Sequence, residues 1–426
     1  MEKWKRFGLE INNVSLKELL LHPVMLWGYL FLSIGIFGIY EVFHERYFLL
    51  SAHAFDAGLH PGSREVAEAM REAIFGAGGE VKREAPWTLY IANYMYMIYT
   101  GSGIIFLVAL AELFGVEIIK KTAAGFMMFG LGIVFAGLFT IAVDLNILHM
   151  QWMFLSPNFG AGMWLMLPLY SIYIPFVLFE IYLLLTHNSA WAKKIAVGIL
   201  VLSVAIDIVE YYIQAKLFNM NTARHLWTSY PNLTLYFILS AFVAASGMMI
   251  VYAYWTYRKT LQEAFDTLID FLKKIATASI LLLGAYEAMA FLFVDKKWAG
   301  VMLFGEFRTA FYLYVAVAMV VPFALLSCKR FRGAARTTVT LIAAVMILVG
   351  TYLGRYLFVY GGNAYPMSDR FGTGFEKYSE YESIKEVIYY APSLAEICVA
   401  VGSIGVILLV YKIVDAYLSV SSISTH

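Results

Sequence analysis

Carboxyl side chains inside apolar stretches are the residues of this sequence best suited to chemistry. One helical stripe, at i, i+3, i+4 and i+7, is formed by Asp207, Glu210, Tyr211 and Gln214. Ionisable groups at membrane depth are costly, so a stripe of this kind must face the interior of a helix bundle. The sequence therefore indicates acid–base chemistry inside an apolar layer.

A second set of polar residues lies where another apolar run ends. Asp144 precedes His149 and Trp152 in the stretch "VDLNILHMQW". A neutral imidazole beside a carboxylate can exchange protons near neutral pH, although a lone histidine at the end of a span is commonly an interfacial residue. We expect Asp144 and His149 to share one pocket with Asp207, Glu210 and Tyr90.

The composition is that of a membrane protein. The chain has 426 residues, of which 61% are hydrophobic and only 14% charged. A net charge of +1 gives no general attraction to nucleic acid. Cys328 and Cys398 are too few to hold an iron–sulfur cluster, and no histidine lies in the middle of a span to bind haem. We therefore expect no metal, haem or cluster in this chain.

Apolar runs long enough to cross a bilayer can be recognised ten times. They lie near 23–43, 87–114, 122–148, 161–186, 191–218, 231–256, 272–294, 303–327, 337–360 and 391–418. Lys and Arg concentrate at the N-terminus and in the loops after the second, fourth, sixth and eighth spans. By the positive-inside rule both termini are cytoplasmic and the long connections 44–86 and 361–390 face outward.

The first twenty residues contain no cleavable signal peptide. Ser15 followed by Glu18 suggests a capping box that opens a short interfacial helix. An ordinary turn before the first span explains the same residues equally well.

An internal repeat divides the chain. "MIYTGSGIIFLVAL" resembles "FVAASGMMIVYAYW", and the same offset places Asp144 beside Glu287 and Glu210 beside Arg355. Small-residue patches recur in any packed membrane bundle, but the charged positions follow the offset too. We predict an all-α protein with two related four-helix bundles, residues 87–218 and 231–360. Residues 1–86 and 361–426 would supply one flanking span each, together with the outer loops.

Two further sets of charges allow more than one interpretation. In the second bundle, Arg308 and Arg355 either neutralise Glu287 or Glu306 and hold helices together, or belong with Tyr352 to a second functional site. Near the cytoplasmic side, Glu112 and Glu180 either begin a proton path or only extend to water.

Three stretches together resemble a known family. "YTGSG", "VDLNILHMQWMFLSPNFGAGMW" and "YLGRYLFVYGG" are similar to segments of the NrfD-like membrane subunits of polysulfide reductase and related respiratory complexes. The resemblance covers roughly residues 87–360. Ten spans resemble the larger members, such as the DsrP or HmeB subunit of the sulfite-reduction-associated menaquinol-oxidising complex.

The resemblance implies a subunit without redox metal that binds menaquinone near the outer face. It also implies an outer-face ferredoxin-like iron–sulfur partner and further subunits, a cytochrome and a haem b membrane subunit among them. The resemblance places the quinone and proton site at Asp144, with His149 near it and Tyr90, Asn93 and Tyr94 lining the ring pocket. From their positions in the spans we add Asp207 and Glu210 as acid–base residues and Trp152, Tyr211 and Arg355 as quinone contacts. Many members follow the aspartate with Gly-Arg-Pro, whereas here Asn146, Ile147 and Leu148 precede His149.

The function we expect is electron exchange between menaquinone or menaquinol and the iron–sulfur partner, coupled to proton transfer in a prokaryotic cytoplasmic membrane. Such a subunit would serve anaerobic respiration, for example in sulfur metabolism. An ion-coupled secondary transporter remains an alternative because repeated bundles with buried carboxylates suit ion transport. A passive membrane anchor for a soluble enzyme is the other alternative.

Overall fold

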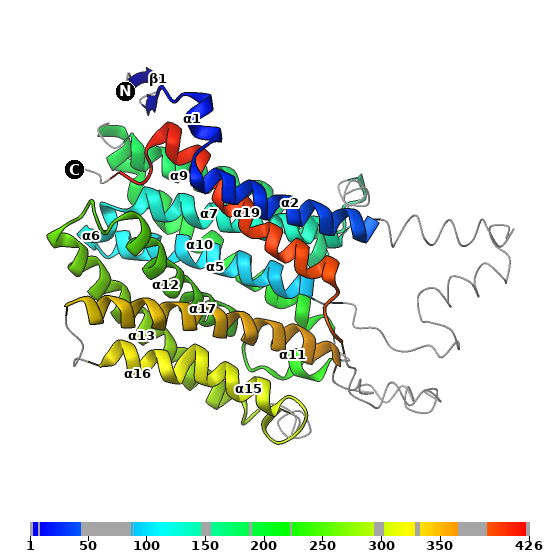
Figure 1. Ribbon diagram of the computed structural model, residues 1–426. Coiled ribbons are helices and arrows are strands. Elements are labelled where there is room, and N and C mark those ends of the chain that lie inside the picture. Colours follow the sequence, from blue (N-terminus) through cyan, green and yellow to red (C-terminus); the bar gives the residue numbers. More distant parts are fainter. Residues whose placement is uncertain are drawn as a thin grey trace, which may run out of the picture.

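Long helices lying side by side build almost the whole molecule (Figure 1). The computed structural model describes residues 3–6, 9–43, 87, 89–145, 155–186, 190–221, 224–293, 302–328, 333–364 and 390–422. Both termini lie at one end of the bundle, which we call the near end (Figure 1). The opposite end, where α2 (Pro23–Phe43) finishes and α5 (Leu89–Leu113) begins, is called the far end.

The long helices lie where apolar runs predict them. After α2 and α5 come α7 (Ala123–Asp144), α9 (Gly162–Leu185), α10 (Ala190–Asn219), α12 (Leu233–Thr256), α13 (Glu263–Ala290), α15 (Arg308–Val315), α16 (Val321–Ser327), α17 (Gly333–Ala364) and α19 (Leu394–Leu418). Short helices α1 (Leu16–Leu20), α6 (Glu117–Lys120) and α11 (His225–Ser229) connect them. Nine segments of the described chain are long and apolar enough to cross a membrane, which confirms a multi-pass membrane protein.

Helix α13 differs from its prediction. Its apolar part, predicted from residue 272, is the continuation of a helix that already begins at Glu263. The added turns carry Asp266 and Asp270. The apolar part itself contains Lys273, Lys274 and Glu287, so α13 is not among the nine segments. The charged turns obscure the helix in a hydropathy pattern because they are amphipathic rather than apolar.

The N-terminal segment is not purely helical. Strands β1 (Lys3–Arg6) and β2 (Leu9–Asn12) pair as an antiparallel hairpin that the sequence prediction missed. The amide of Asn12 donates to the carbonyl oxygen of Ala416 at 3.0 Å and thereby ties the hairpin to the last turn of α19. The short helix α1 is present as expected, but Ser15 makes no capping hydrogen bond, so the predicted capping box is wrong.

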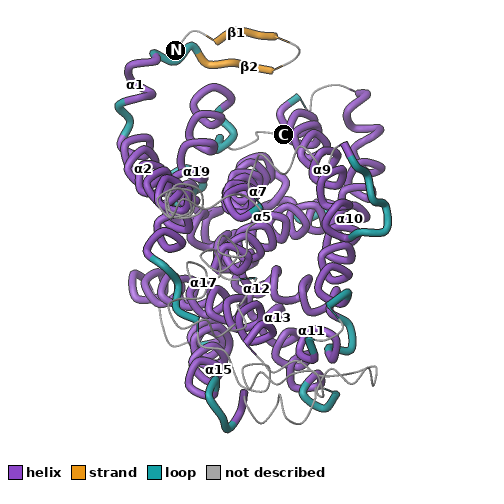
Figure 2. Tube along the Cα trace, turned by 90° about the vertical axis from the view of Figure 1, so that its right-hand side faces the viewer, coloured by secondary structure: helices purple, strands orange, loops and turns teal. Residues whose placement is uncertain are grey.

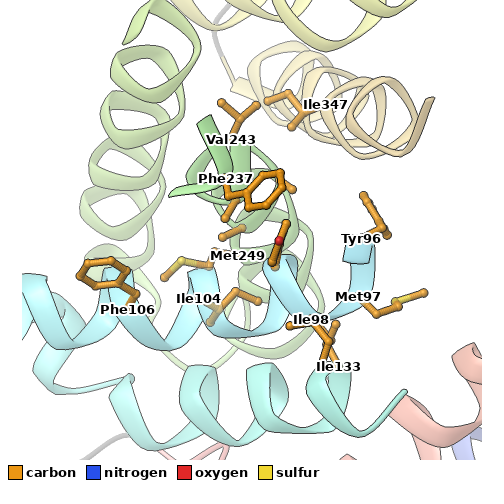
Figure 3. Packing of buried hydrophobic residues seen from close by; sticks show 14 of the residues in the cluster. Tyr96, Met97, Ile98, Ile104, Phe106, Ile133, Phe237, Val243, Met249 and Ile347 are labelled. Carbon is orange, nitrogen blue, oxygen red and sulfur yellow. The ribbon is translucent and has the colours of Figure 1, made fainter. Parts of the chain in front are cut away.

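Helix α5 occupies the centre of the bundle (Figure 2). Nearly all of its side chains are buried. Ile98 of α5 lies beside Ile133 of α7, while Phe237 and Met249 of α12 lie toward its other side (Figure 3). Because α5 contacts neighbours on every side, residues on any of its faces can join a buried site.

Glycines allow several of these helices to approach closely. A Cβ atom added to Gly35 of α2 would lie 2.7 Å from the Cα atom of Gly402 of α19, so these two backbones touch. Gly101 of α5 meets the carbonyl oxygen of Gly130 of α7 in the same way. Small residues are typical of such contacts because packing, rather than the hydrophobic effect, holds helices together in lipid.

The segment formed by α15 and α16 contains a wide turn. A π-helical stretch, η2 (Ala316–Val320), joins α15 to α16 just before Pro322, which removes a backbone donor. Gly350 of α17 packs directly onto Ala318, and a Cβ atom there would overlap its backbone. By contrast, α9 remains helical across Pro168 and Pro175.

The glycine contact between α2 and α19 gives a first prediction. Gly402→Ile should lower the free energy of unfolding by about 1–3 kcal/mol, because a branched side chain forces two touching backbones apart. A lower midpoint of thermal unfolding in detergent would show this. Gly198→Ile is the matched control, since nothing lies within 4 Å of the Cβ position at Gly198. Equal midpoints for the two variants would contradict the close approach.

Candidate functional site

The side chain of Glu210 lies at the centre of a buried hydrogen-bond cluster between α9 and α10. The hydroxyl of Tyr170 donates to Glu210 Oε1 at 2.9 Å, and the amide of Gln214 donates to the same oxygen at 3.0 Å. Gln214 also donates to Tyr170 Oη at 2.9 Å. Since Tyr170 uses its own proton toward Glu210, Tyr94 of α5 is the donor in its 3.3 Å contact with Tyr170.

Asp207 lies one helical turn nearer the middle of α10 and is fully buried. The hydroxyl of Tyr173 is within interaction range of Asp207, but neither carboxylate oxygen meets the geometry of a hydrogen bond to a described residue. No Lys, Arg or His of the described chain lies within 4.0 Å of the Asp207 or Glu210 carboxylates. These two groups are thus carboxyls in an apolar interior without a neutralising cation, which is an arrangement typical of proton relays.

Tyr211 connects this cluster to the central helix. Its hydroxyl forms a 2.9 Å hydrogen bond with Ser102 of α5, and its ring lies 5.3 Å from that of Tyr99. Tyr99 is buried, and its hydroxyl has no hydrogen bond among the described residues. Aromatic and hydroxyl groups thus continue from α10 across α5.

The carboxyls continue toward the near end. Ser203 donates to Glu180 Oε2 at 3.0 Å, and Glu180 lies within electrostatic range of both Asp207 and Glu112. Glu180 is buried, so it does not extend to water. Glu112 is partly exposed but keeps one oxygen buried and without a hydrogen bond. Carboxyl groups therefore follow one another from the near end to Glu210, which favours the proton-path interpretation of Glu180.

Tyr90 and Asn93 of α5 contact other helices than Tyr94 does. Asn93 donates to Thr140 of α7 at 2.9 Å and to Ser403 of α19 at 3.3 Å. Tyr90 belongs to a separate cluster with Val42 and Val399 of the flanking helices. The structure thus brings Tyr94 to Glu210 but places Tyr90 and Asn93 toward α7 and α19.

Asp144 is the last residue of α7 and is partly buried. Its neighbour Val143 packs against the cluster of Tyr90 and Val399, toward the flanking helices. Within the described chain, the hydrogen bonds of Glu210 reach α9 and α10 rather than Asp144. The proposed partners His149 and Trp152 lie outside the described residues.

Arg355 of α17 lies between the two predicted bundles. Its guanidinium stands 4.5 Å from the ring centroid of Tyr99, a cation–π contact, and donates to Ser240 of α12 at 2.5 Å. Its Nη1 atom is buried and makes no hydrogen bond to a described residue. Glu287 instead accepts a hydrogen bond from Tyr314, so no ion pair joins Glu287 to Arg355 in the described structure.

The other charged residues of the second bundle lie apart from this group. Glu306 and Arg308 are exposed near the start of α15. Tyr352 is partly buried, and its ring lies 4.9 Å from that of Tyr96 of α5. The predicted neutralisation of Glu287 or Glu306 by arginine is therefore not found among the described contacts.

Two residues of the Glu210 cluster were missing from the predicted site, Tyr170 and Tyr173 of α9. The signal was present in the sequence, because Tyr170, Tyr173, Val177 and Glu180 occur at successive intervals of three, four and three residues. This spacing places them on one face of a helix. Tyrosines are common in any membrane span near an interface, and the stripe was therefore not distinguished from an aromatic belt.

The Glu210 cluster predicts two different effects on stability. Glu210→Gln should leave the unfolding midpoint near that of the wild type, because an amide oxygen still accepts from Tyr170. Glu210→Leu should cost about 1–3 kcal/mol, because the Tyr170 hydroxyl and Gln214 amide lose their common acceptor. Thermal unfolding in detergent compares the two variants. A leucine variant as stable as the glutamine variant would show that these hydrogen bonds do not stabilise the fold.

Comparison with known proteins gives this arrangement a family. The model of a family described as polysulphide reductase, NrfD, matches residues 80–366, which is more than half of the chain. No curated protein matches the chain. The matched range begins just before α5 and ends just after α17, and it therefore includes the Glu210 cluster, Arg355 and Glu287. The family's proteins work with partner subunits in membrane complexes. The chain belongs to the NrfD family, which suggests a membrane subunit of a quinone-interacting oxidoreductase complex.

Proposed function

We propose that the chain exchanges electrons between menaquinone or menaquinol and an iron–sulfur protein bound at its far end, with proton transfer through Asp207 and Glu210. The observation that carries this proposal is the pair of buried carboxyls without a cation, of which Glu210 is held by Tyr170 and Gln214. A carboxyl group in this setting can take a proton from a hydroxyl group and pass it on.

The residues present fit a quinone through carboxylate oxygens that accept no hydrogen bond from a described residue. When bound, a quinol supplies two electrons and two protons. Tyr94 and Gln214 lie about 8 Å from the far ends of α5 and α10, at a rise of roughly 1.5 Å per residue. Their hydrogen atoms already point to Tyr170 and Glu210, so a ring oxygen would bind by replacing one of these acceptors. Glu210 and Asp207 lie one and two turns deeper on α10, where each offers an oxygen with no hydrogen bond to a described residue.

Glu180 and Glu112 lie between Asp207 and the near end, and they provide a route along which a proton can travel. Glu180 and Glu112 connect Asp207 with the near end, which we place on the cytoplasmic side together with both termini. Ser203 holds Glu180 in position through its hydrogen bond. We infer that protons move between the cluster and the cytoplasmic side along these residues.

We propose that the chain crosses the cytoplasmic membrane of a prokaryote ten times. The ten spans are the nine apolar segments and, in addition, α13. The resemblance to the larger family members, of the DsrP or HmeB kind, supports a place in sulfur-linked anaerobic respiration. The ferredoxin-like partner would dock over the far end, and a cytochrome and a haem b membrane subunit would complete the complex.

The two alternatives receive less support. A secondary transporter uses helices that are interrupted at mid-membrane, whereas α9 is continuous across both of its prolines, and α15, η2 and α16 form one unbroken segment. A passive anchor gives no reason to place Asp207, Glu210 and Glu180 in the interior, because each buried carboxyl is costly.

Purification from the native membrane tests the function as a whole. We expect the chain to copurify with an iron–sulfur subunit, detected by its electron paramagnetic resonance signal, and with menaquinone, detected by solvent extraction. A chain that purifies without either would contradict the proposal. Turnover with a menaquinol analogue then provides the assay for single variants.

Removing the acid–base group gives a prediction about turnover. Glu210→Gln should lower menaquinol turnover by about 100-fold or more while leaving the complex assembled, because proton transfer contributes on this scale. Glu396→Gln is the matched control, since Glu396 of α19 is also buried and accepts a hydrogen bond from the backbone N–H of Ser393 at 2.8 Å, which an amide oxygen can also do. Similar turnover in both variants would remove Glu210 from the mechanism.

A separate prediction concerns Asp144. If the end of α7 contributes the proton acceptor, Asp144→Asn should abolish turnover with menaquinol analogues while assembly stays intact. Blue native electrophoresis checks assembly, and the same turnover assay checks function. Unchanged turnover would exclude Asp144 from proton transfer and leave Asp207 and Glu210 as the acid–base groups.

A further inference from the structure

Arg355 of α17 is a buried cation whose hydrogen bonds are incomplete. Its side chain is 5% exposed, and its Nη2 atom donates to the hydroxyl of Ser240. Its Nη1 atom is buried and donates to no described residue. A guanidinium that is removed from water is costly unless its donors are paired. Arg355 therefore needs an acceptor that the described side chains do not supply.

Aromatic rings surround this guanidinium without supplying that acceptor. Its central carbon lies 4.5 Å from the ring centroid of Tyr99, 5.3 Å from that of Phe237 and 5.6 Å from that of Tyr236. The face of a ring attracts a cation, but it accepts an N–H group only weakly. The rings thus offset part of the cost of burying the charge and leave the donor at Nη1 unused.

Glu287 of α13 has the complementary deficit. It is 8% exposed, and the hydroxyl of Tyr314 donates to its Oε1 atom, whereas its other oxygen accepts from no described residue. Glu287 lies within electrostatic range of Arg355, but no direct ion pair joins the two in the described structure. One region of the second half therefore contains a cationic donor without an acceptor and a carboxylate acceptor without a donor.

Two small hollows lie between these groups. Glu287 lines the outer hollow, Arg355 lines the inner hollow, and Tyr236, Tyr314 and Gly354 line both. The outer hollow leaves about 20 Å³ to a water-sized sphere, and the inner hollow leaves about 10 Å³. An enclosed water molecule needs roughly 10–15 Å³, so each hollow has room for roughly one water molecule and is too small for a ring.

Water is the ligand whose hydrogen bonds match both ends. It can accept from Arg355 and donate to Glu287, whereas a small cation would match only Glu287 and a small anion only Arg355. Two hydroxyl oxygens offer further partners. Tyr314 uses its proton toward Glu287 and can still accept, and the buried hydroxyl of Tyr99, which lines the inner hollow, has no hydrogen bond to a described residue. Buried water molecules typically make about three hydrogen bonds to groups of this kind.

We propose that ordered water binds in the two hollows and joins Arg355 to Glu287 in a water-separated ion pair. The chain of hydrogen bonds runs from the Nη1 donor through water in the inner and outer hollows to the unused oxygen of Glu287. With Tyr314, it ties α13, α15 and α17 together and gives the buried guanidinium its counter-charge within the second half. The inference does not depend on the proposed function, and it assigns Arg355 to water rather than to a quinone.

X-ray radiolysis in isotopically labelled water tests the site in the purified complex. Hydroxyl radicals that form from a bound water molecule oxidise the side chains beside it, and mass spectrometry locates the added oxygen. We expect oxidation of Tyr99 and Tyr314. Tyr252 and Tyr411 are the reference, because they are also buried, hydrogen-bond to each other and line neither hollow. Oxidation of Tyr99 and Tyr314 no higher than that of this pair would overturn the site.

A filling variant assigns the oxidation to the inner hollow. Ala244 of α12 is 3% exposed and lines this hollow, so Ala244→Leu should abolish the oxidation of Tyr99 by excluding the water. Ala288→Leu is the matched control and should retain it, because Ala288 is an exposed position on α13. Undiminished oxidation of Tyr99 in Ala244→Leu would place the source of the radicals elsewhere and overturn the proposal.

A double-mutant cycle tests the ion pair without relying on the filling variant. Arg355→Met and Glu287→Gln should each lower the midpoint of thermal unfolding in detergent, because each leaves one buried charge unbalanced. The double variant should lose less than the sum of the two shifts. The matched pair is Arg355→Met with Glu180→Gln, since Glu180 is a buried carboxyl of the first half that is held by Ser203, and its shifts should add.

The outcomes of the cycle separate the parts of the proposal. Additive shifts for Arg355→Met and Glu287→Gln would overturn the pairing of these residues. Non-additive shifts without oxidation of Tyr99 and Tyr314 would overturn the water and indicate a direct ion pair. Non-additive shifts together with oxidation that Ala244→Leu removes would support the water-separated pair.

Discussion

Hydrocarbon offers no hydrogen-bond partner, and this constraint governs where every polar side chain of the bundle lies. Within the spans, Asp207, Glu210 and Glu180 all lie on inward faces, and two of them obtain partners from tyrosine and serine hydroxyls. The same constraint explains why α9 and α10 pair through polar stripes. Tyr170 and Tyr173 on one helix meet Glu210 and Asp207 on the other, so the residues suited to proton transfer are also residues that specify how these helices pack.

The positions of the helices could be predicted from the sequence because an apolar run of sufficient length has few alternatives in a membrane. The stripe on α10 was likewise predicted to face inward, and it does. The side of α5 that would face the cluster could not be predicted. A helix surrounded by neighbours is buried on every face, so the spacing of its apolar residues does not indicate which face points to which neighbour. In the structure Asn93 faces α7, while Tyr94 faces α9. The β1–β2 hairpin was missed because the membrane pattern gives no information about residues outside the spans.

The two halves of the chain meet along an extensive surface, because α5 packs against both α12 and α17. Gly103 of α5 packs against the carbonyl oxygen of Ala241 on α12, and Arg355 of α17 reaches across to the ring of Tyr99. Arg355 lies between Glu287 and the Tyr211 end of the Glu210 cluster, with Tyr99 as the intermediate ring. This buried guanidinium forms an ion pair with neither carboxylate in the described structure.

The wide turn at Ala316–Val320 has a geometric consequence for this arrangement. A π-turn accommodates one residue more than an α-helical turn, so the part of the helix before it is rotated by about 100° relative to a regular helix. Tyr314 lies just before the turn, and the added rotation sets the direction in which its hydroxyl points toward Glu287. The contact of Ala318 with Gly350 keeps the turn in register with α17. Loss or gain of a single codon in this stretch would therefore redirect Tyr314 while leaving the length and hydrophobicity of the span almost unchanged, a kind of change that hydropathy does not detect.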